Sequence, residues 1–201
     1  MITIVDYGMG NLGSVLNMLK YIGVQAIISG DLATIAQATK LLLPGVGAFD
    51  NAMACINESG LRQVLDYKAM VERVPVLGIC LGMQILTRSS EEGRLPGLGW
   101  IAAQTCRFPM VPSLKVPHMG WNVVTPTSAS PLTRDLADAP RFYFVHSYCI
   151  HVDDEGHSIL KATHGVPFDA GIQYGNVYGV QFHPEKSHRF GMQLLHNFAS
   201  L

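Results

Sequence analysis

The chain has 201 residues, of which 48% are hydrophobic and 14% charged, and its formal net charge is −1. This length suits one domain, residues 1–201, with a large buried core, and the composition excludes a disordered chain. The balanced charge, without a dense run of Lys and Arg, argues against nucleic acid or an anionic membrane as the main partner.

The cysteine pattern and the N-terminus bear on redox state and location. Cysteines stand at positions 55, 80, 106 and 149, without a Cys-x-x-Cys pair, and their spacing fits neither a zinc site nor a small disulfide scaffold. The first residues are too short and acidic for a signal peptide, and no apolar run approaches the length of a membrane span. We therefore expect a cytoplasmic protein with reduced thiols and no metal.

The first half of the chain alternates apolar strands with helical patterns. Strands are predicted over residues 2–5, 24–28, 40–43 and 74–79, and helices over residues 11–21 and 31–38, around 61–70 and from 83 onward. Near-continuous apolar strands that alternate with helices are typical of a parallel sheet covered on both faces. Ligands collect at the carboxyl ends of such strands, where Gly47 and Cys80 both lie.

After Gly97 the pattern changes to short strands separated by Pro, Gly and charged turns. Strands are predicted over residues 100–108, 120–125, 142–150, 159–163, 170–174 and 177–182. Ser187 is expected to cap a last helix that carries apolar residues at helical spacing. The predicted fold class is therefore α/β, with a central, mainly parallel sheet flanked by helices and a more mixed, β-rich second half.

The segment Gly78-Ile79-Cys80-Leu81-Gly82 directly follows an apolar strand. A nucleophile on a sharp strand-to-helix turn needs small residues on both sides, because the strained backbone leaves no room for Cβ atoms. A thiol there lies at the positive end of a helix dipole, which favours the thiolate. Cys80 is thus a candidate nucleophile, although these residues alone also fit a buried cysteine beside a glycine-rich turn.

The best-placed base for Cys80 is His183, at the end of the apolar strand that leads into His183-Pro184-Glu185. Its imidazole would emerge at the sheet edge, where a base reaches the nucleophile. Glu185 would orient the ring and stabilise its charged form, which gives a Cys-His-Glu triad. Considered alone, His183 also fits an ordinary strand-end histidine, and Glu185 a solvated carboxylate paired with Lys186.

Attack on a carbonyl also needs hydrogen-bond donors for the developing oxyanion, each worth roughly 2.7–4 kcal/mol. The amide of Leu81, just after the nucleophile, is one candidate. The turn Pro44-Gly45-Val46-Gly47 offers another from a neighbouring strand end, because glycine lets backbone N–H groups point into a site. This turn alone also fits a plain end of a strand.

A dinucleotide site is an alternative at the N-terminus. Gly8, Gly10 and Gly13 have the Gly-x-Gly-x-x-Gly spacing, and Asp31 follows near the place of a ribose-binding carboxylate. Nicotinamide binding would leave the cysteine elbow and the His-Pro-Glu segment unexplained.

Six segments together resemble the class I (triad) glutamine amidotransferases, in the order of that family and over nearly the whole chain. The elbow and the His-Pro-Glu segment are typical of the family, and Pro-Gly-Val-Gly at 44–47 and Pro-His-Met-Gly-Trp-Asn at 117–122 are similar to its glutaminase subunits that serve histidine biosynthesis. The segments are residues 6–12, 43–47, 78–84, 117–122, 143–148 and 178–185. The resemblance implies a single flavodoxin-like domain without a cofactor.

The resemblance also implies a reaction. Cys80 would attack the side-chain amide of glutamine, His183, oriented by Glu185, would protonate the departing ammonia, and water would hydrolyse the glutamyl thioester. An oxyanion hole of Leu81 and Val46 is implied, completed by a peptide flip between Gly45 and Val46 when a partner is engaged. The residues implied to hold glutamine are Gly47, Gln84, Glu92, Ser147 and Tyr148.

The family further implies a partner. Ammonia would pass through a channel into a (β/α)8-barrel synthase subunit that docks over the glutaminase site and forms a heterodimer with it. Residues 117–122 resemble the strip at that interface, where the contacts would be His118, Met119, Trp121 and Asn122. The same strip also fits a Trp-anchored hairpin that packs on its own core.

Two other functions stay open. Similar subunits supply ammonia to synthase-like partners that amidate sugars of surface polysaccharides. No residue separates the two acceptors, because this chain does not touch the acceptor. A free-standing Cys-His hydrolase would use the same elbow, and strong glutamine hydrolysis without any partner would indicate it.

Overall fold

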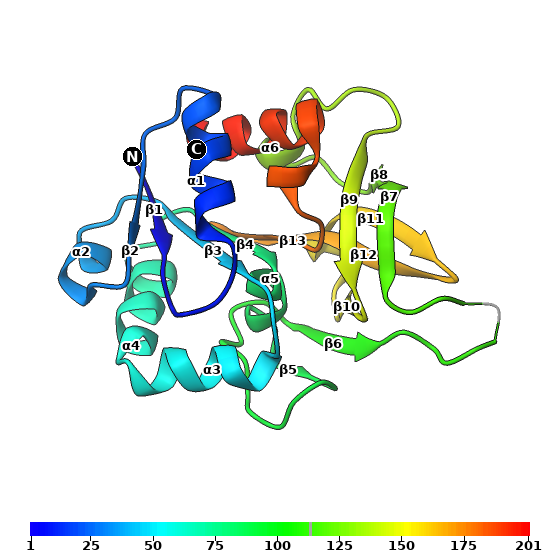
Figure 1. Cartoon of the computed structure of the whole chain (residues 1–201), viewed down its shortest axis with the longest axis horizontal. Helices are drawn as coiled ribbons and strands as arrows, with labels where there is room; N and C mark the ends of the chain where they lie inside the picture. Colours follow the sequence, from blue (N-terminus) through cyan, green and yellow to red (C-terminus); the bar gives the residue numbers. More distant parts are fainter. Residues whose placement is uncertain (113) are drawn as a thin grey trace.

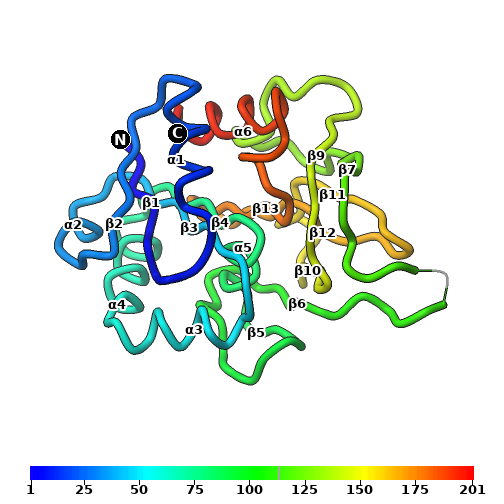
Figure 2. Tube along the Cα trace, viewed as in Figure 1, coloured from blue at the N-terminus to red at the C-terminus, as the bar shows by residue number. Residues whose placement is uncertain are grey.

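The computed structural model describes residues 1–112 and 114–201. Its main sheet has the strand order β2-β1-β3-β4-β13-β12-β10-β6-β5, with β11 beside β12 and β8 beside β11 (Figure 1). A separate two-stranded sheet is formed by β7 (His118–Val123) and β9 (Arg141–His146), which run antiparallel. The tube view shows that the N-terminal and the C-terminal segments of the chain both lie in the parallel half (Figure 2).

The parallel half of the main sheet comes from both ends of the chain. Its strands, in spatial order, are β2 (Ala26–Ser29), β1 (Ile2–Val5), β3 (Leu41–Gly45), β4 (Val76–Cys80) and β13 (Val177–Val180). Neighbouring strands in this set are parallel, so their carboxyl ends meet at one edge. Because β13 lies directly beside β4, segments about a hundred residues apart in sequence end side by side.

Helices cover both faces of this half (Figure 1). The helices are α1 (Leu12–Tyr21) and α6 (His188–Ser200) on one face, and α2 (Leu32–Ala36), α3 (Phe49–Glu58) and α4 (Leu61–Asp66) on the other, with a π-helical turn at Tyr67–Val71. Alternate residues of β3 enter two separate apolar clusters: Leu42 packs with α1 and α6, whereas Leu41 and Leu43 pack with α3 and α4. Side chains of a strand point to opposite faces, so both faces must be apolar.

The second half of the main sheet is mostly antiparallel. Its strands are β12 (Val166–Tyr174), β10 (Tyr148–Val152), β6 (Ala103–Arg107), β5 (Ser89–Ser90), β11 (Ser158–His164) and β8 (Thr125–Pro126). β12 is antiparallel to β13, β10 and β11, and β10 is antiparallel to β6, whereas β5 and β6 are parallel. The predicted α/β fold class, with a parallel half and a mixed half, is confirmed.

Two local predictions are wrong, and one helix was missed. Residues 142–150 are not one strand, because the chain leaves the small sheet after His146 and joins the main sheet at Tyr148. Helix α3 was not predicted. Ser187 directly precedes α6 but does not cap it. Its hydroxyl instead donates to the carbonyl of His183 at 2.6 Å and accepts from the amide of Tyr143 at 3.0 Å.

Candidate active site

Cys80 occupies a strained turn at the carboxyl end of β4. It is followed at once by the short helix α5 (Leu81–Ile85), and its φ of 56° lies in the left-handed region. A Cβ on Gly78 would lie 2.4 Å from the carbonyl oxygen of Gly82, and a Cβ on Gly82 would lie 1.6 Å from that of Leu43 on β3. Both glycines are therefore required by the backbone itself, as the elbow pattern predicts.

Gly82→Ala is expected to destabilise the fold by about 3 kcal/mol or more, because the new methyl would overlap the backbone of β3 and neither element can move freely. The measurement is thermal or urea unfolding. Gly13→Ala in α1 is the matched control, since its nearest contact would be 3.9 Å away, and it should be neutral or stabilising by up to about 1 kcal/mol. Equal stability of the two variants would contradict the close packing at the elbow.

His183 follows β13 at the same sheet edge. The register pairs Val180 with Ile79, so the chain beyond β13 ends beside Cys80. Nδ1 of His183 lies 2.8 Å from Oε1 of Glu185, and both side chains are buried, 3% and 4% exposed. Nε2 of His183 has no hydrogen-bond partner among the described residues, which leaves it free to share a proton with the thiol.

The electrostatics favour a charged imidazole. Burial by itself opposes the charge, but the nearby Cys80 and the hydrogen-bonded, negatively charged Glu185 outweigh it and raise the pKa of His183 to about 9. Protonated near neutral pH, the ring can stabilise a thiolate on Cys80 and later donate its proton. This pair suits nucleophilic attack on an acyl group followed by protonation of the leaving group.

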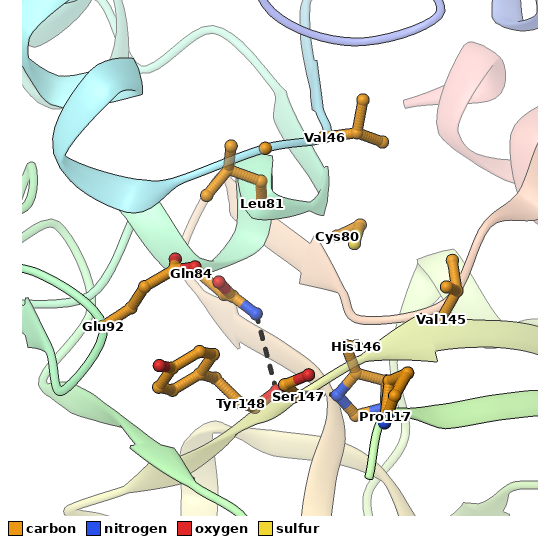
Figure 3. A pocket seen from close by; sticks show the side chains of 11 residues that line it. Val46, Cys80, Leu81, Gln84, Glu92, Pro117, Val145, His146, Ser147 and Tyr148 are labelled. Atoms are coloured by element: carbon orange, nitrogen blue, oxygen red, sulfur yellow. Dashed lines mark hydrogen bonds between the residues drawn. The ribbon is translucent and has the colours of Figure 1, made fainter.

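A pocket of about 420 Å³ opens beside Cys80 (Figure 3). Every residue predicted for glutamine binding or the oxyanion hole lines it, namely Val46, Gly47, Leu81, Gln84, Glu92, Ser147 and Tyr148. Gly47 has a φ of 118°, which only glycine adopts without strain. Glu92 reaches the site through Oε2, which accepts from the amide of Phe49 at 2.9 Å and so holds the start of α3.

Two buried residues near Cys80 were not predicted from the sequence. Nε2 of Gln181 lies 3.7 Å from Sγ of Cys80, and Oε1 of Gln181 accepts from Gln84 at 3.2 Å. The hydroxyl of Tyr7 donates to the carbonyl of Pro44 at 2.7 Å, and burial together with the nearby Cys80 raises the pKa of Tyr7. Their only signal was their position in the family-like segments, because each simply follows an apolar strand and shows no spacing of its own.

The strip at residues 117–122 separates into two faces. Met119 and Trp121 point outward, 63% and 47% exposed. His118 is buried, and Asn122 is half-buried and donates to the carbonyl of Thr163 at 2.9 Å. The alternation along β7 thus gives one apolar outer face and one polar inner face.

The N-terminal glycine turn has a structural role that requires no bound nucleotide. A Cβ on Gly10 would lie 3.2 Å from Cα of Gly45, so this turn packs against the end of β3. The carboxylate of Asp31 accepts from the amide of Thr34 at 2.8 Å and from its hydroxyl at 2.7 Å, which caps α2. The carboxylate that a ribose would require is therefore already engaged.

No helix among the described residues is long and apolar enough to cross a membrane. Likewise, the described residues contain no group of three His, Cys, Asp or Glu side chains that would hold a metal ion.

The chain is similar to curated proteins over its full length. It is 50% identical over 198 residues to the imidazole glycerol phosphate synthase subunit HisH 2 of Methanococcus maripaludis, covering 98% of each chain. It is 50% identical over 201 residues to the subunit of the same name of Pseudomonas aeruginosa, and 48% identical over 204 residues to subunit HisH of Bdellovibrio bacteriovorus, each with full coverage of both chains.

Solved structures support the same fold at lower identity. A crystal structure described as a glutamine amidotransferase matches with a TM-score of 0.76 at 18% identity, covering both chains fully. A putative GMP synthase protein of Thermoplasma acidophilum matches with a TM-score of 0.74 at 20% identity, covering 99% of this chain and 92% of the other. The family model for class-I glutamine amidotransferases matches residues 3–200. The chain therefore belongs to the class-I glutamine amidotransferase family.

Proposed function

We propose that this chain is the glutaminase subunit of an imidazole glycerol phosphate synthase and acts as one catalytic domain. The observation that carries the proposal is the strained Cys80 beside the buried pair of His183 and Glu185, at the mouth of a pocket lined by the predicted glutamine-binding residues. Relatives that carry the synthase name cover the whole chain, which supports the choice of acceptor.

The proposed reaction follows from the geometry of the pocket. The thiolate of Cys80 attacks the amide carbon of glutamine, and the developing oxyanion accepts from the amide of Leu81. Val46, in the exposed loop after β3, supplies a second donor when its peptide turns toward the pocket. Imidazolium at His183 protonates the nitrogen that leaves as ammonia, and the neutral ring then activates water to hydrolyse the glutamyl thioester.

Glutamine would lie between the loop after β3 and the start of β10 (Figure 3). Gln84, Ser147 and Tyr148 contribute polar groups to the lining of this space. Glu92 provides the negative charge that suits an α-ammonium group. These assignments account for the predicted binding residues with one substrate.

The rate is expected to depend on the charge of His183. As the pH rises through about 9, this ring loses the proton that the leaving nitrogen must receive, so kcat/KM for glutamine should fall above that pH. The measurement is a pH profile of glutamate formation by the complex. A profile that stays flat to well above pH 9 would contradict the role of His183 as the acid.

A partner surface lies next to the pocket. The outer face of β7 and β9 pairs Met119 with Val145 and Trp121 with Tyr143, and Val145 itself lines the pocket. Exposed apolar side chains in a row are typical of an interaction site. We propose that a (β/α)8-barrel synthase subunit docks on this face, covers the pocket mouth and receives ammonia before water protonates it.

The decisive test is glutamine hydrolysis with and without the barrel partner and its ligand. We expect the isolated chain to be slow and the complex to be at least about 10-fold faster, with Trp121→Glu removing the stimulation by weakening binding. Tyr21→Glu at the end of α1, another exposed aromatic residue, is the control for the added charge. Full activity without any partner would indicate a free-standing hydrolase instead.

A second acceptor is supported by one observation. Two of the relatives carry the number 2 in their names, as a second copy of such a protein in one organism does. A duplicated copy is free to serve a synthase-like partner that amidates surface-polysaccharide sugars. Recovery of the partner by pull-down, and complementation of a histidine auxotroph that lacks its own glutaminase subunit, decide between the two.

We also propose a cytoplasmic location. All four cysteines are free thiols, at positions 55, 80, 106 and 149, and unpaired cysteines suit a reducing compartment.

A further inference from the structure

Two buried histidines connect β7 with the pocket wall. His118 on β7 and His146 on β9 are direct cross-strand partners and are 5% and 6% exposed. Nδ1 of His118 lies 2.9 Å from Nε2 of His146, and Nδ1 of His146 lies 2.7 Å from the carbonyl oxygen of Tyr148. His146, which itself lines the pocket, therefore contacts the first residue of β10, and Figure 3 shows it beside Ser147.

The proton positions in this chain of hydrogen bonds follow from its ends. A carbonyl only accepts, so Nδ1 of His146 carries the hydrogen and its Nε2 accepts from Nδ1 of His118. Nε2 of His118 must then accept, and the side-chain amide of Asn122 donates to it at 3.1 Å. Both rings are neutral in this arrangement. Burial lowers the pKa of His118 to about 4 and that of His146 to about 3, which agrees.

The Tyr148 carbonyl is also connected to Cys80, through the side chains of two glutamines. The side-chain amide of Gln84 also points at the Tyr148 carbonyl, at 3.5 Å, and it donates to Oε1 of Gln181 at 3.2 Å. That second bond directs the amide of Gln181 at Sγ of Cys80, 3.7 Å away. The contact of Gln84 with the Tyr148 carbonyl is long for a hydrogen bond. The strong hydrogen bond to this carbonyl is therefore the one from His146.

The surroundings of the two rings are aromatic. His146 lies 5.2 Å from Phe108, 5.5 Å from Phe144 and 5.3 Å from Phe168, measured between ring centroids, and His118 stacks on Phe144 at 4.7 Å. Phenylalanine would fill this space without the cost of burying polar atoms. The space is thus shaped for aromatic rings, whereas the hydrogen bonds are what histidine adds.

We propose that His118 and His146 are positioning residues for glutamine hydrolysis. They hold Ser147 and Tyr148, at the point where the chain passes from the small sheet to the main sheet, in the place that forms the pocket wall. The proposal rests on the glutaminase function described above. Without the pair, the wall loses its support and the substrate binds more weakly, while the chemistry at Cys80 is retained.

The test compares two replacements of His146 in the assembled complex. His146→Phe keeps the ring and removes both hydrogen bonds, so we expect the KM for glutamine to rise roughly tenfold with kcat changed much less. His146→Asn puts an amide donor in the place of Nδ1 and should keep KM within about 3-fold of the wild type, although the smaller side chain lowers the Tm. The reverse order, with Phe normal and Asn impaired, would show that the ring only fills space and would overturn the proposal.

His118→Phe provides the second measurement. It removes the donor to His146 and should raise KM by a smaller factor, and adding it to His146→Phe should cause no further rise, because the chain is already broken. Additive effects of the two substitutions on KM would contradict a single connected chain of hydrogen bonds. Failure of the function itself is seen separately: the wild-type complex would then hydrolyse no glutamine, or Cys80→Ala would still do so.

Discussion

Cys80→Ala is expected to abolish glutamine-dependent product formation by the complex, by at least about 10³-fold, while synthesis with added ammonium salt continues. In the proposed reaction the thiol forms the acyl intermediate, and no other nucleophile lines the pocket in a strained turn of this kind among the described residues. The proposed barrel subunit, in contrast, would need only ammonia. Both activities are measured on the same purified complex.

Cys55→Ala serves as the control, because Cys55 is an exposed free thiol on α3. It should retain both activities. The glutamine analogue 6-diazo-5-oxo-norleucine should label Cys80 and spare the other three cysteines. Labelling elsewhere, or loss of the ammonia-dependent reaction with the complex intact, would show that Cys80 is not a dedicated glutaminase residue.

Glu185→Gln is expected to lower kcat by about 10³–10⁴-fold with little change in KM, because this carboxylate bonds to the proposed base His183 and does not line the pocket. The amide can still bond to Nδ1 of His183, so the local fold is kept. Without the negative charge the imidazolium is less favoured, and any residual activity should decline at a lower pH than in the wild type.

The measurement is a full pH profile of kcat for both proteins. Asp153→Asn is the matched control, since it removes an exposed carboxylate that pairs with Arg88 and does not line the pocket. That variant should leave kcat unchanged. An unshifted profile in Glu185→Gln, or a loss of rate confined to KM, would exclude the proposed role of the carboxylate.

Much of the site was accessible from the sequence because its chemistry depends on local backbone constraints. The elbow needs glycine at positions 78 and 82, since any Cβ there meets backbone atoms, and such a requirement leaves a readable spacing. His183 and Glu185 are close in sequence, so a single turn brings them together. The alternating strand and helix patterns of the first half likewise reflect burial on both faces of a parallel sheet.

Other features depend on contacts between distant segments and leave no local pattern. The break at Ser147 cannot be seen in the continuous β-like sequence of residues 142–150. It arises because β9 pairs with β7 in the small sheet, whereas β10 pairs with β6 in the main sheet. Ser187 has the residue type of a helix cap, yet its hydroxyl is taken by His183 and Tyr143. In the sequence, Gln181 is only one more residue of a predicted buried strand. Its contact with Cys80 becomes apparent when β13 is placed beside β4.

The sequence by itself therefore pointed to the candidate nucleophile, its candidate base and carboxylate, and the parallel half of the fold, because each leaves a steric or periodic pattern within a few residues. It pointed to the family through a resemblance over six segments. Only the tertiary structure decided which side chains face the pocket, that His118 turns inward while Met119 and Trp121 turn outward, and how a chain of hydrogen bonds crosses from β7 to the pocket wall. Those features arise from the pairing of strands that are far apart in sequence, and pairing is a property of the packed sheet rather than of any one segment.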